Sequence, residues 1–225
     1  MMRTLILDGA IGTALLKKGF KPPFENLNIT HPEVIKSIHQ SYIASGSEIL
    51  LTHTFNAKTL EQCEAAWNNI KDLPVRKFAS IGPEAHVEVI LDYFQDKVER
   101  FVFETIYTLD LANDLLSKYH HLDPIFSFCL KPKDFKSALK MITQYRISTI
   151  GLNCLDGFKD SEELLNLIPK HYEIYFKPNA GLQNLAADEF KEQMEVILKN
   201  HQLTYVGGCC GTDATYIKTI SDLLS

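Results

Sequence analysis

The sequence contains no concentration of basic residues and no long apolar run. Of its 225 residues, 23 are lysine or arginine and 28 are aspartate or glutamate, which gives a formal net charge of -5. The basic residues are dispersed, the longest cluster being Lys17-Lys18, whereas a nucleic-acid or anionic-membrane surface needs a basic patch. No stretch approaches the ~18 apolar residues of a membrane span. The composition therefore argues against nucleic-acid and membrane partners.

Cysteine is also scarce. There are five cysteines, an odd number, and two of them are adjacent, which is a poor framework for disulfides but suits a ligand set in a reducing compartment. The first residues, M-M-R-T-L-I-L-D, form too short an apolar stretch for a signal peptide and reach Asp8 at once. We therefore expect a cytoplasmic protein.

Apolar, β-rich runs alternate with amphipathic helical patterns along the sequence, with no linker or change of composition between them. The predicted strands are Leu5–Leu7, Glu48–Thr52, Phe78–Ile81, Phe101–Glu104, Ile125–Cys129, Thr149–Asn153, Glu173–Lys177 and Thr204–Val206. The predicted helices are Pro32–Ala44, Leu60–Ile70, Glu84–Phe94, Leu109–Tyr119, Pro132–Gln144, Ser161–Ile168, Ala187–Lys199 and Thr215–Leu224. This alternation predicts one α/β domain over residues 1–225.

Four of these strands are evenly spaced. Those that begin at Phe101, Ile125, Thr149 and Glu173 follow one another at steps of 24 residues, which is room for one strand, one three-turn helix and two short connections. Eight strands, each followed by a helix, are the pattern of a (β/α)8 TIM barrel. A doubly wound open sheet shows the same alternation, but the count of eight favours a single compact barrel with short loops.

Polar and glycine-containing segments follow the predicted strands, where a barrel of this kind builds its active site. They are D-G-A-I-G-T at 8–13, T-H-T-F-N at 52–56, I-G-P at 81–83, E-T at 104–105, G-L-N-C at 151–154, K-P-N-A-G at 177–181 and G-G-C-C-G-T at 207–212. Cys154 thus ends the sixth strand, and Cys209 and Cys210 end the eighth. In a closed barrel these two strand ends share one rim, with a single strand between them.

The two adjacent cysteines lie in a glycine-rich segment. In a regular strand, Cys209 and Cys210 would point to opposite faces, but Gly207, Gly208 and Gly211 accept backbone angles that other residues avoid. Both sulfurs can therefore turn toward one point. Three thiolates suit zinc, and they leave one tetrahedral position open, which is typical of a catalytic rather than a structural zinc site.

The motifs D-G-A-I-G-T, G-L-N-C, P-N-A-G and G-G-C-C-G-T, in this order, resemble those of the homocysteine S-methyltransferases. T-F-N, E-T-I and P-N-A-G-L add a closer similarity to the homocysteine-binding barrel of cobalamin-dependent methionine synthase. The resemblance spans nearly the whole chain, from Asp8 to Thr212. The ordered set is specific, whereas D-G-x-x-G-T alone would not be.

This resemblance implies zinc-dependent transfer of a methyl group to the thiol of homocysteine, giving methionine. Cys154, Cys209 and Cys210 would hold the zinc, and the sulfur of homocysteine would enter the fourth position. A free alkyl thiol, with a pKa of about 8.5, is mostly protonated at neutral pH, whereas coordination to zinc holds it as the thiolate. Asp8 and Glu104 would hold the ammonium group of the substrate.

Further residues complete the implied substrate site. Backbone N–H groups of the turn at 9–12, those of Gly9 and Ala10 among them, would donate to the substrate carboxylate, because glycine-rich turns form anion-binding nests. Asn153 would orient a turn or a thiolate through its amide. Simpler interpretations stay open beside these, since Asp8 could only cap its turn and Asn179 could only support P-N-A-G. Cys63 and Cys129 are predicted to pack in the core.

The sequence departs from the family in two places. The family usually has N-T-F where this chain has H-T-F, so His53 either replaces asparagine without effect or alters the pocket. Family members are also usually longer, and here I-G-P runs almost directly into a helix. A shortened rim would leave the zinc open, so a methyl-corrinoid protein carrying methylcobalamin is one candidate donor, beside S-methylmethionine and S-adenosylmethionine.

Two alternatives remain at this stage. The acceptor could be another small thiol or a selenol, with the same chemistry. The chain could instead be a non-catalytic or split-enzyme subunit that binds homocysteine and zinc.

Overall fold

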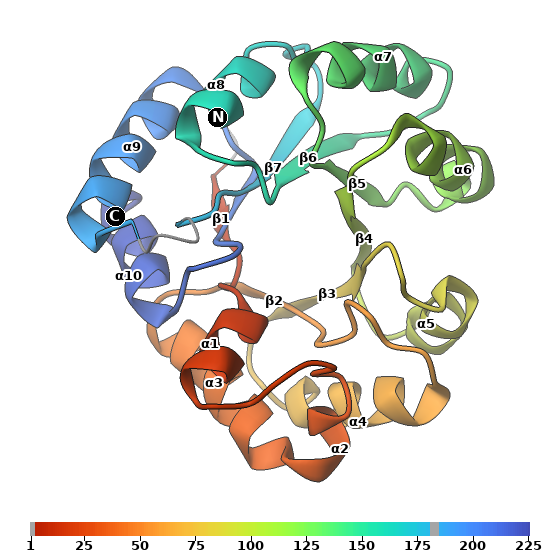
Figure 1. Ribbon diagram of the computed structural model, residues 1–225, viewed down its shortest axis with the longest axis vertical. Helices are drawn as coiled ribbons and strands as arrows, with labels where there is room; N and C mark the ends of the chain where they lie inside the picture. The colour runs from red at the N-terminus through yellow and green to blue at the C-terminus, as the bar shows by residue number, and fades with distance from the viewer. Residues whose placement is uncertain (1–2, 181–184) are drawn as a thin grey trace.

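The computed structural model describes residues 3–180 and 185–225, which form a ring of eight parallel strands surrounded by helices (Figure 1). The strands are β1 (Leu5–Ile6), β2 (Ile49–Leu51), β3 (Arg76–Ile81), β4 (Arg100–Ile106), β5 (Ile125–Phe128), β6 (Thr149–Asn153), β7 (Glu173–Lys177) and β8 (Tyr205–Val206). They lie in the order β1-β8-β7-β6-β5-β4-β3-β2. This is the predicted (β/α)8 barrel, and β8 lies next to β7, one strand from β6.

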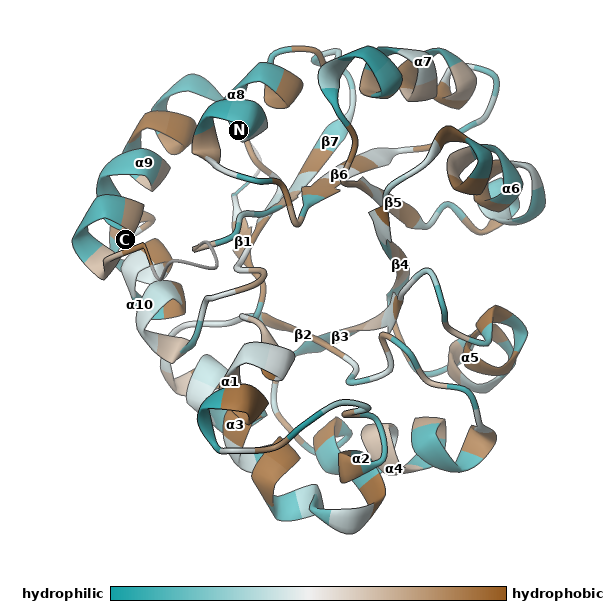
Figure 2. Ribbon diagram, in the orientation of Figure 1, coloured by the Kyte–Doolittle hydropathy of each residue, from teal (hydrophilic) through white to brown (hydrophobic). Residues whose placement is uncertain are grey.

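The helices cover the outside of the ring. They are α1 (Ile11–Lys17), α2 (Leu27–Thr30), α3 (Pro32–Ala44), α4 (Leu60–Ile70), α5 (Val87–Phe94), α6 (Leu109–Tyr119), α7 (Pro132–Ile142), α8 (Phe158–Leu165), α9 (Ala187–Asn200) and α10 (Ala214–Leu223), with one 3-10 turn at His120–Leu122. In α6 the hydrophobic residues face the strands and the hydrophilic ones face outward (Figure 2). No helix in the described part of the chain is long and apolar enough to cross a membrane.

The ring is nearly closed between its first two strands. The N–H of Glu48 donates to the carbonyl of Ile6 at 2.8 Å, and the N–H of Leu51 donates to a carboxylate oxygen of Asp8 at 2.9 Å. Between the other strands, such an N–H group donates to a carbonyl of the neighbouring strand. At this seam the Asp8 side chain accepts the hydrogen bond instead. Asp8 therefore has a structural contact on the strand that closes the barrel.

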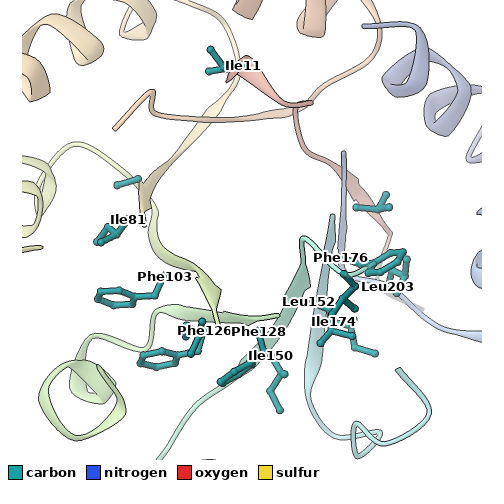
Figure 3. Close-up of a cluster of buried hydrophobic side chains, with 14 of the residues drawn as sticks. Ile11, Ile81, Phe103, Phe126, Phe128, Ile150, Leu152, Ile174, Phe176 and Leu203 are labelled. Carbon is teal, nitrogen blue, oxygen red and sulfur yellow. The ribbon is translucent and has the colours of Figure 1, made fainter. Parts of the chain in front are cut away.

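Two apolar layers hold the strands. Figure 3 shows Ile81, Phe103, Phe126 and Phe176 on the outer side of the strands, in the larger cluster, which also takes in the buried faces of the helices. The smaller cluster alternates with it along the strands and fills the inside of the ring: Leu7, Ile49, Leu51, Phe78, Val102, Ile125, Tyr175 and Tyr205. Strands buried on both faces explain why the sequence shows continuous apolar runs.

Two short helices were not expected from the sequence. Helix α1 begins at Ile11, so Ile11 and Gly12 are helical and the predicted turn at 9–12 is wrong for its second half. Helix α2 has only 4 residues. Neither helix has a side-chain cap, and both are too short to show a 3.6-residue period, which is why the pattern did not indicate them.

Candidate metal centre

The three cysteines singled out from the sequence meet at the rim of the barrel. Their sulfur atoms all lie within 4.8 Å of one another. Cys154 Sγ lies 2.9 Å from Cys209 Sγ and 3.7 Å from Cys210 Sγ. The predicted convergence of the sixth and eighth strand ends is therefore present in the structure.

The backbone around the adjacent cysteines is set by close packing. A Cβ on Gly207 would lie 2.6 Å from the carbonyl oxygen of Asp8, and a Cβ on Gly208 would lie 2.3 Å from Thr212 Oγ1. Neither glycine has the positive φ that the sequence argument assumed; only Gly211 does, at 86°. The first two glycines are thus required by space: Gly207 because the chain runs against Leu7 and Asp8, directly after β1, and Gly208 because the Thr212 side chain folds back on it.

Cys154 is held in a strained conformation. Its φ is 56°, and that of Thr105, near the end of β4, is 60°, in the left-handed region that costs a non-glycine residue about 1–3 kcal/mol. Asn153 ties the two segments together: its Oδ1 accepts from the N–H of Thr105 at 3.0 Å and from Ser127 Oγ at 2.7 Å. Its Nδ2 lies 3.9 Å from Cys209 Sγ. The amide thus holds the end of β4 and also reaches a cluster sulfur.

The donor set fits zinc. With Zn–S bonds of about 2.3 Å, tetrahedral sulfurs lie about 3.8 Å apart. The distance between Cys154 and Cys210 is close to this value, whereas Cys154 and Cys209 lie nearer to each other. The thiols are also poised to lose protons unevenly. Hydrogen bonds with Cys209 and Cys210 raise the pKa of Cys154, whereas hydrogen bonds with Cys154 and Cys209 lower the pKa of Cys210 to about 3. Three thiolates this close need a cation to hold them together.

Below the cysteines, Asp8 forms a buried ion pair that the sequence did not indicate. Lys177, the last residue of β7, places its Nζ 3.0 Å from Asp8 Oδ1, and the two side chains are 6% and 1% exposed. Burial raises the pKa of Asp8, and the Lys177 charge and the Leu51 N–H oppose that rise. Burial lowers the pKa of Lys177, but the charges of Asp8 and Glu104 outweigh it, so that the pKa is raised overall. The sequence does contain one sign of this ion pair: Lys177 directly follows the apolar residues I-Y-F, where a charged side chain needs a partner.

Glu104 lies on the inner side of β4. Its carboxylate accepts hydrogen bonds from Ser80 Oγ at 2.6 Å and from Tyr175 OH at 3.1 Å. Burial raises the pKa of Glu104, and the nearby Lys177 charge opposes this. Asp8, Glu104 and Lys177 form an acidic floor with two carboxylates and one ammonium group.

The remaining predicted residues lie close by. Gly9 packs under the ring of Tyr42. The N–H of Ala10 donates to Thr212 Oγ1 at 3.3 Å. The Asn179 side chain donates to the carbonyl of Leu155 at 2.9 Å, which agrees with a supporting role. The P-N-A-G-L motif ends in Gly181 and Leu182, which lie outside the described residues.

Three other residues lie outside the cluster. Cys63 is fully buried in the core, as predicted. Cys129 was expected inside the fifth strand, but it follows β5 and donates its S–H to the carbonyl of Cys154 at 3.0 Å. His53 is buried, with its Nδ1 3.1 Å from Asn28 Oδ1 in α2, so its described partner belongs to a helix and not to the cysteine cluster.

Comparison with known proteins gives a family match. The model of the homocysteine S-methyltransferase family matches residues 5–80 and 83–224. The methionine synthases of Mycobacterium tuberculosis and Mycobacterium leprae are 26% and 25% identical over alignments that cover 97% of this chain. Those alignments cover 24% of each synthase, so the chain spans about a quarter of the length of these relatives.

Solved structures show the same fold. The apo form of the homocysteine methyltransferase MmuM from Escherichia coli superposes with a TM-score of 0.75 at 19% identity, covering 99% of this chain and 96% of that one. The metallated form gives 0.74 at 17% identity, covering 98% and 96%. At identities of 17–19%, the comparison shows that the two proteins share a fold.

Proposed function

Because the chain belongs to the homocysteine S-methyltransferase family, a family of methyltransferase enzymes, we propose that it transfers a methyl group to the thiol of homocysteine, giving methionine. The observation that carries this proposal is the convergence of Cys154, Cys209 and Cys210 at the rim of the barrel. The family resemblance implies the same role for these three residues.

Zinc is the cofactor that the three thiols suit. When bound, it would supply the affinity for sulfur that holds the acceptor thiol as a thiolate nucleophile. The residues of the chain fix the site around it. Asn153 holds the Cys154 segment against Thr105 at the end of β4. Gly207 lets the segment before Cys209 run against Leu7 and Asp8, and Gly208 leaves room for the Thr212 side chain. Methyl transfer then depends on positioning more than on acid–base chemistry.

The acidic floor would bind the amino-acid end of homocysteine. The family resemblance implies Asp8 and Glu104 as the carboxylates for its ammonium group, since an opposite charge in a buried site is stabilising only when paired. The N–H of Gly9 is a candidate donor to the substrate carboxylate, and Ala10 is a second one once it releases Thr212. Asn153 would help to orient the segment that carries Cys154, through its hydrogen bonds to Thr105.

The methyl donor is proposed to come from a large partner. Only five residues separate β3 from α5, from Gly82 to His86, so the rim is short there, and Cys210 is exposed. A methyl-corrinoid protein or domain carrying methylcobalamin would cover such a rim. S-methylmethionine and S-adenosylmethionine are the small-molecule alternatives.

A donor panel tests the function. Zinc-loaded protein and homocysteine are incubated with each of the three donors, and methionine is measured by mass. Turnover with methylcobalamin on a corrinoid protein supports the proposed donor, and turnover at ordinary enzyme rates with either sulfonium alone contradicts it. No methionine from any donor contradicts the catalytic proposal.

A second candidate is a homocysteine-binding subunit without independent catalysis. It is favoured by the chain spanning only 24% of the methionine synthases it matches. Zinc-dependent binding of homocysteine in a calorimeter, without methyl transfer from any donor, would support it. In both cases the three free thiols need a reducing compartment, such as the cytoplasm. Another small thiol or a selenol as acceptor would give turnover in the same assay when homocysteine is replaced.

A further inference from the structure

Asp8 has both carboxylate oxygens engaged within the protein. Oδ1 accepts from the Lys177 ammonium group at 3.0 Å, and Oδ2 accepts from the N–H of Leu51 at 2.9 Å, across the seam of the barrel. Both charged side chains are almost fully buried. An acceptor ammonium group on Asp8 would lie beside that of Lys177, where two like charges repel in a medium of low dielectric constant.

Glu104 differs from Asp8 in its partners. Its two oxygens accept from neutral hydroxyls, those of Ser80 and Tyr175. Among residues 3–180 and 185–225, no ion pair to Glu104 is formed, and Lys177 pairs with Asp8. A buried carboxylate with neutral donors is a favourable partner for a cation, because its own charge is not yet compensated.

We propose that Lys177 determines acceptor specificity: it commits Asp8 to the barrel seam and leaves Glu104 as the single carboxylate that receives the acceptor ammonium group. The acidic floor then carries the negative charges of Asp8 and Glu104 and the positive charge of Lys177. The ammonium group of one acceptor molecule makes the site neutral. The acceptor class is a small thiol with one ammonium group. This inference rests on the proposed function, and it divides between two residues a role that the family resemblance gave to both.

Calorimetric titration of zinc-loaded protein with homocysteine tests this division. A second probe, γ-mercaptobutyrate, is homocysteine without its amino group and measures the contribution of that group alone. The wild type is expected to prefer homocysteine by ~10- to 100-fold, the range for a hydrogen bond to a charged group. The E104Q variant is expected to lose this preference while keeping zinc and the affinity for γ-mercaptobutyrate.

A pair of double variants separates the two carboxylates. D8N alone leaves Lys177 without its partner and is expected to weaken homocysteine binding. D8N/K177M removes the internal pair as a unit and is expected to restore the preference for homocysteine to within a few-fold of the wild type. The matched variant is E104Q/K177M, which has the same formal charge but lacks Glu104 and frees Asp8 from Lys177, and it is expected to recover part of the preference through Asp8.

The outcomes are distinct. Preference retained in E104Q overturns the inference, because Asp8 would then receive the ammonium group in spite of Lys177. No recovery in E104Q/K177M also overturns it, because Lys177 would then not be what withholds Asp8. A D8N/K177M protein that binds zinc and γ-mercaptobutyrate but has no preference also overturns it. If D8N/K177M does not fold, as its circular dichroism would reveal, the E104Q ratio alone decides. Absence of any homocysteine binding by the wild type would instead overturn the proposed function and, with it, this inference.

Discussion

At the scale of single residues, the cysteine cluster is a rim feature attached to a complete core. Cys154 and Cys209 are half-buried and Cys210 is exposed, and all three lie beyond the apolar layers that hold the strands. A metal bound here would therefore contribute to the site more than to folding. This contrasts with small zinc domains, in which metal binding is the folding energy.

Cys209→Ser tests this separation. The variant is expected to lose zinc, since a serine hydroxyl is a poor replacement for a thiolate, and to keep the circular dichroism spectrum of the barrel. Zinc content by atomic absorption and the far-ultraviolet spectrum are the measurements. A collapsed spectrum would point to a structural metal instead.

The matched control is Cys129→Ser. Cys129 lies against the Cys154 carbonyl, but its sulfur is not in the cluster of three. Serine can donate the same hydrogen bond, so zinc content is expected to stay at the wild-type level. Loss of zinc in this variant would mean that the ligand set is wrongly assigned.

Residue types at strand ends could be predicted, but pairings among buried charges could not. Cys154, Cys209 and Cys210 followed from the geometry of parallel strands, because the ends of β6 and β8 share one rim. The Asp8–Lys177 pair joins residues 169 positions apart. Periodicity says that both can face inward, but it does not say which of the inward side chains meet.

At the scale of elements, the long, regular units were predictable and the short ones were not. The bounds of α3, α4 and α6 match the prediction, because their apolar positions recur at helical spacing. β4 extends to Ile106, past its predicted end at Glu104, with a register shift against β5 between Phe103 and Ile106. A bulge of this kind re-aims side chains near a site and leaves no mark in a pattern of alternating apolar residues.

A second element-scale feature is a pair of buried histidines. His39 in α3 and His53 after β2 are both buried, and burial lowers the pKa of each to about 3. The unfolded chain takes up these protons near pH 6.5, whereas the folded protein does so only near pH 3. Each histidine therefore makes the free energy of unfolding fall as pH drops from about 6.5, by up to ~1.4 kcal/mol per pH unit.

His53→Asn should remove one of these two contributions. The asparagine amide can replace the contact with Asn28 Oδ1, so folding is expected to be kept. The free energy of unfolding, measured by urea titration between pH 4 and 7, is expected to fall with acid less steeply than in the wild type, by up to ~1.4 kcal/mol per unit. Asp8 and Glu104, whose pKa values are raised, act in the opposite direction but equally in both proteins. Identical slopes would mean that His53 is not neutral and buried.

At the scale of the whole molecule, one nearly closed barrel places residues from both ends of the chain in one site. Asp8 follows β1 and Cys209 follows β8, and these two strands are neighbours in the ring. In the sequence, the two residues lie near opposite ends of the chain. The order of strands could be predicted once eight units were counted. The seam between β1 and β2 is bridged by the Glu48 N–H and by the Asp8 side chain. This use of a side chain in place of strand pairing could not be predicted.

Removing the metal should leave this barrel folded. At a free zinc concentration 100 times Kd, binding stabilises by about 2.7 kcal/mol, which for a chain of this size raises Tm by roughly 5–10 °C. A chelator is expected to reverse that shift in differential scanning calorimetry. Cys209→Ser should show no zinc-dependent shift at all, and a shift of the same size in that variant would place the stabilising ion elsewhere.

The central claim is that three protein sulfurs and one acceptor sulfur share a zinc ion. X-ray absorption at the zinc edge counts sulfur neighbours directly, before and after homocysteine is added. The account predicts three sulfur neighbours without homocysteine and four with it. A protein that binds no zinc, or a sulfur count that homocysteine leaves unchanged, would contradict it.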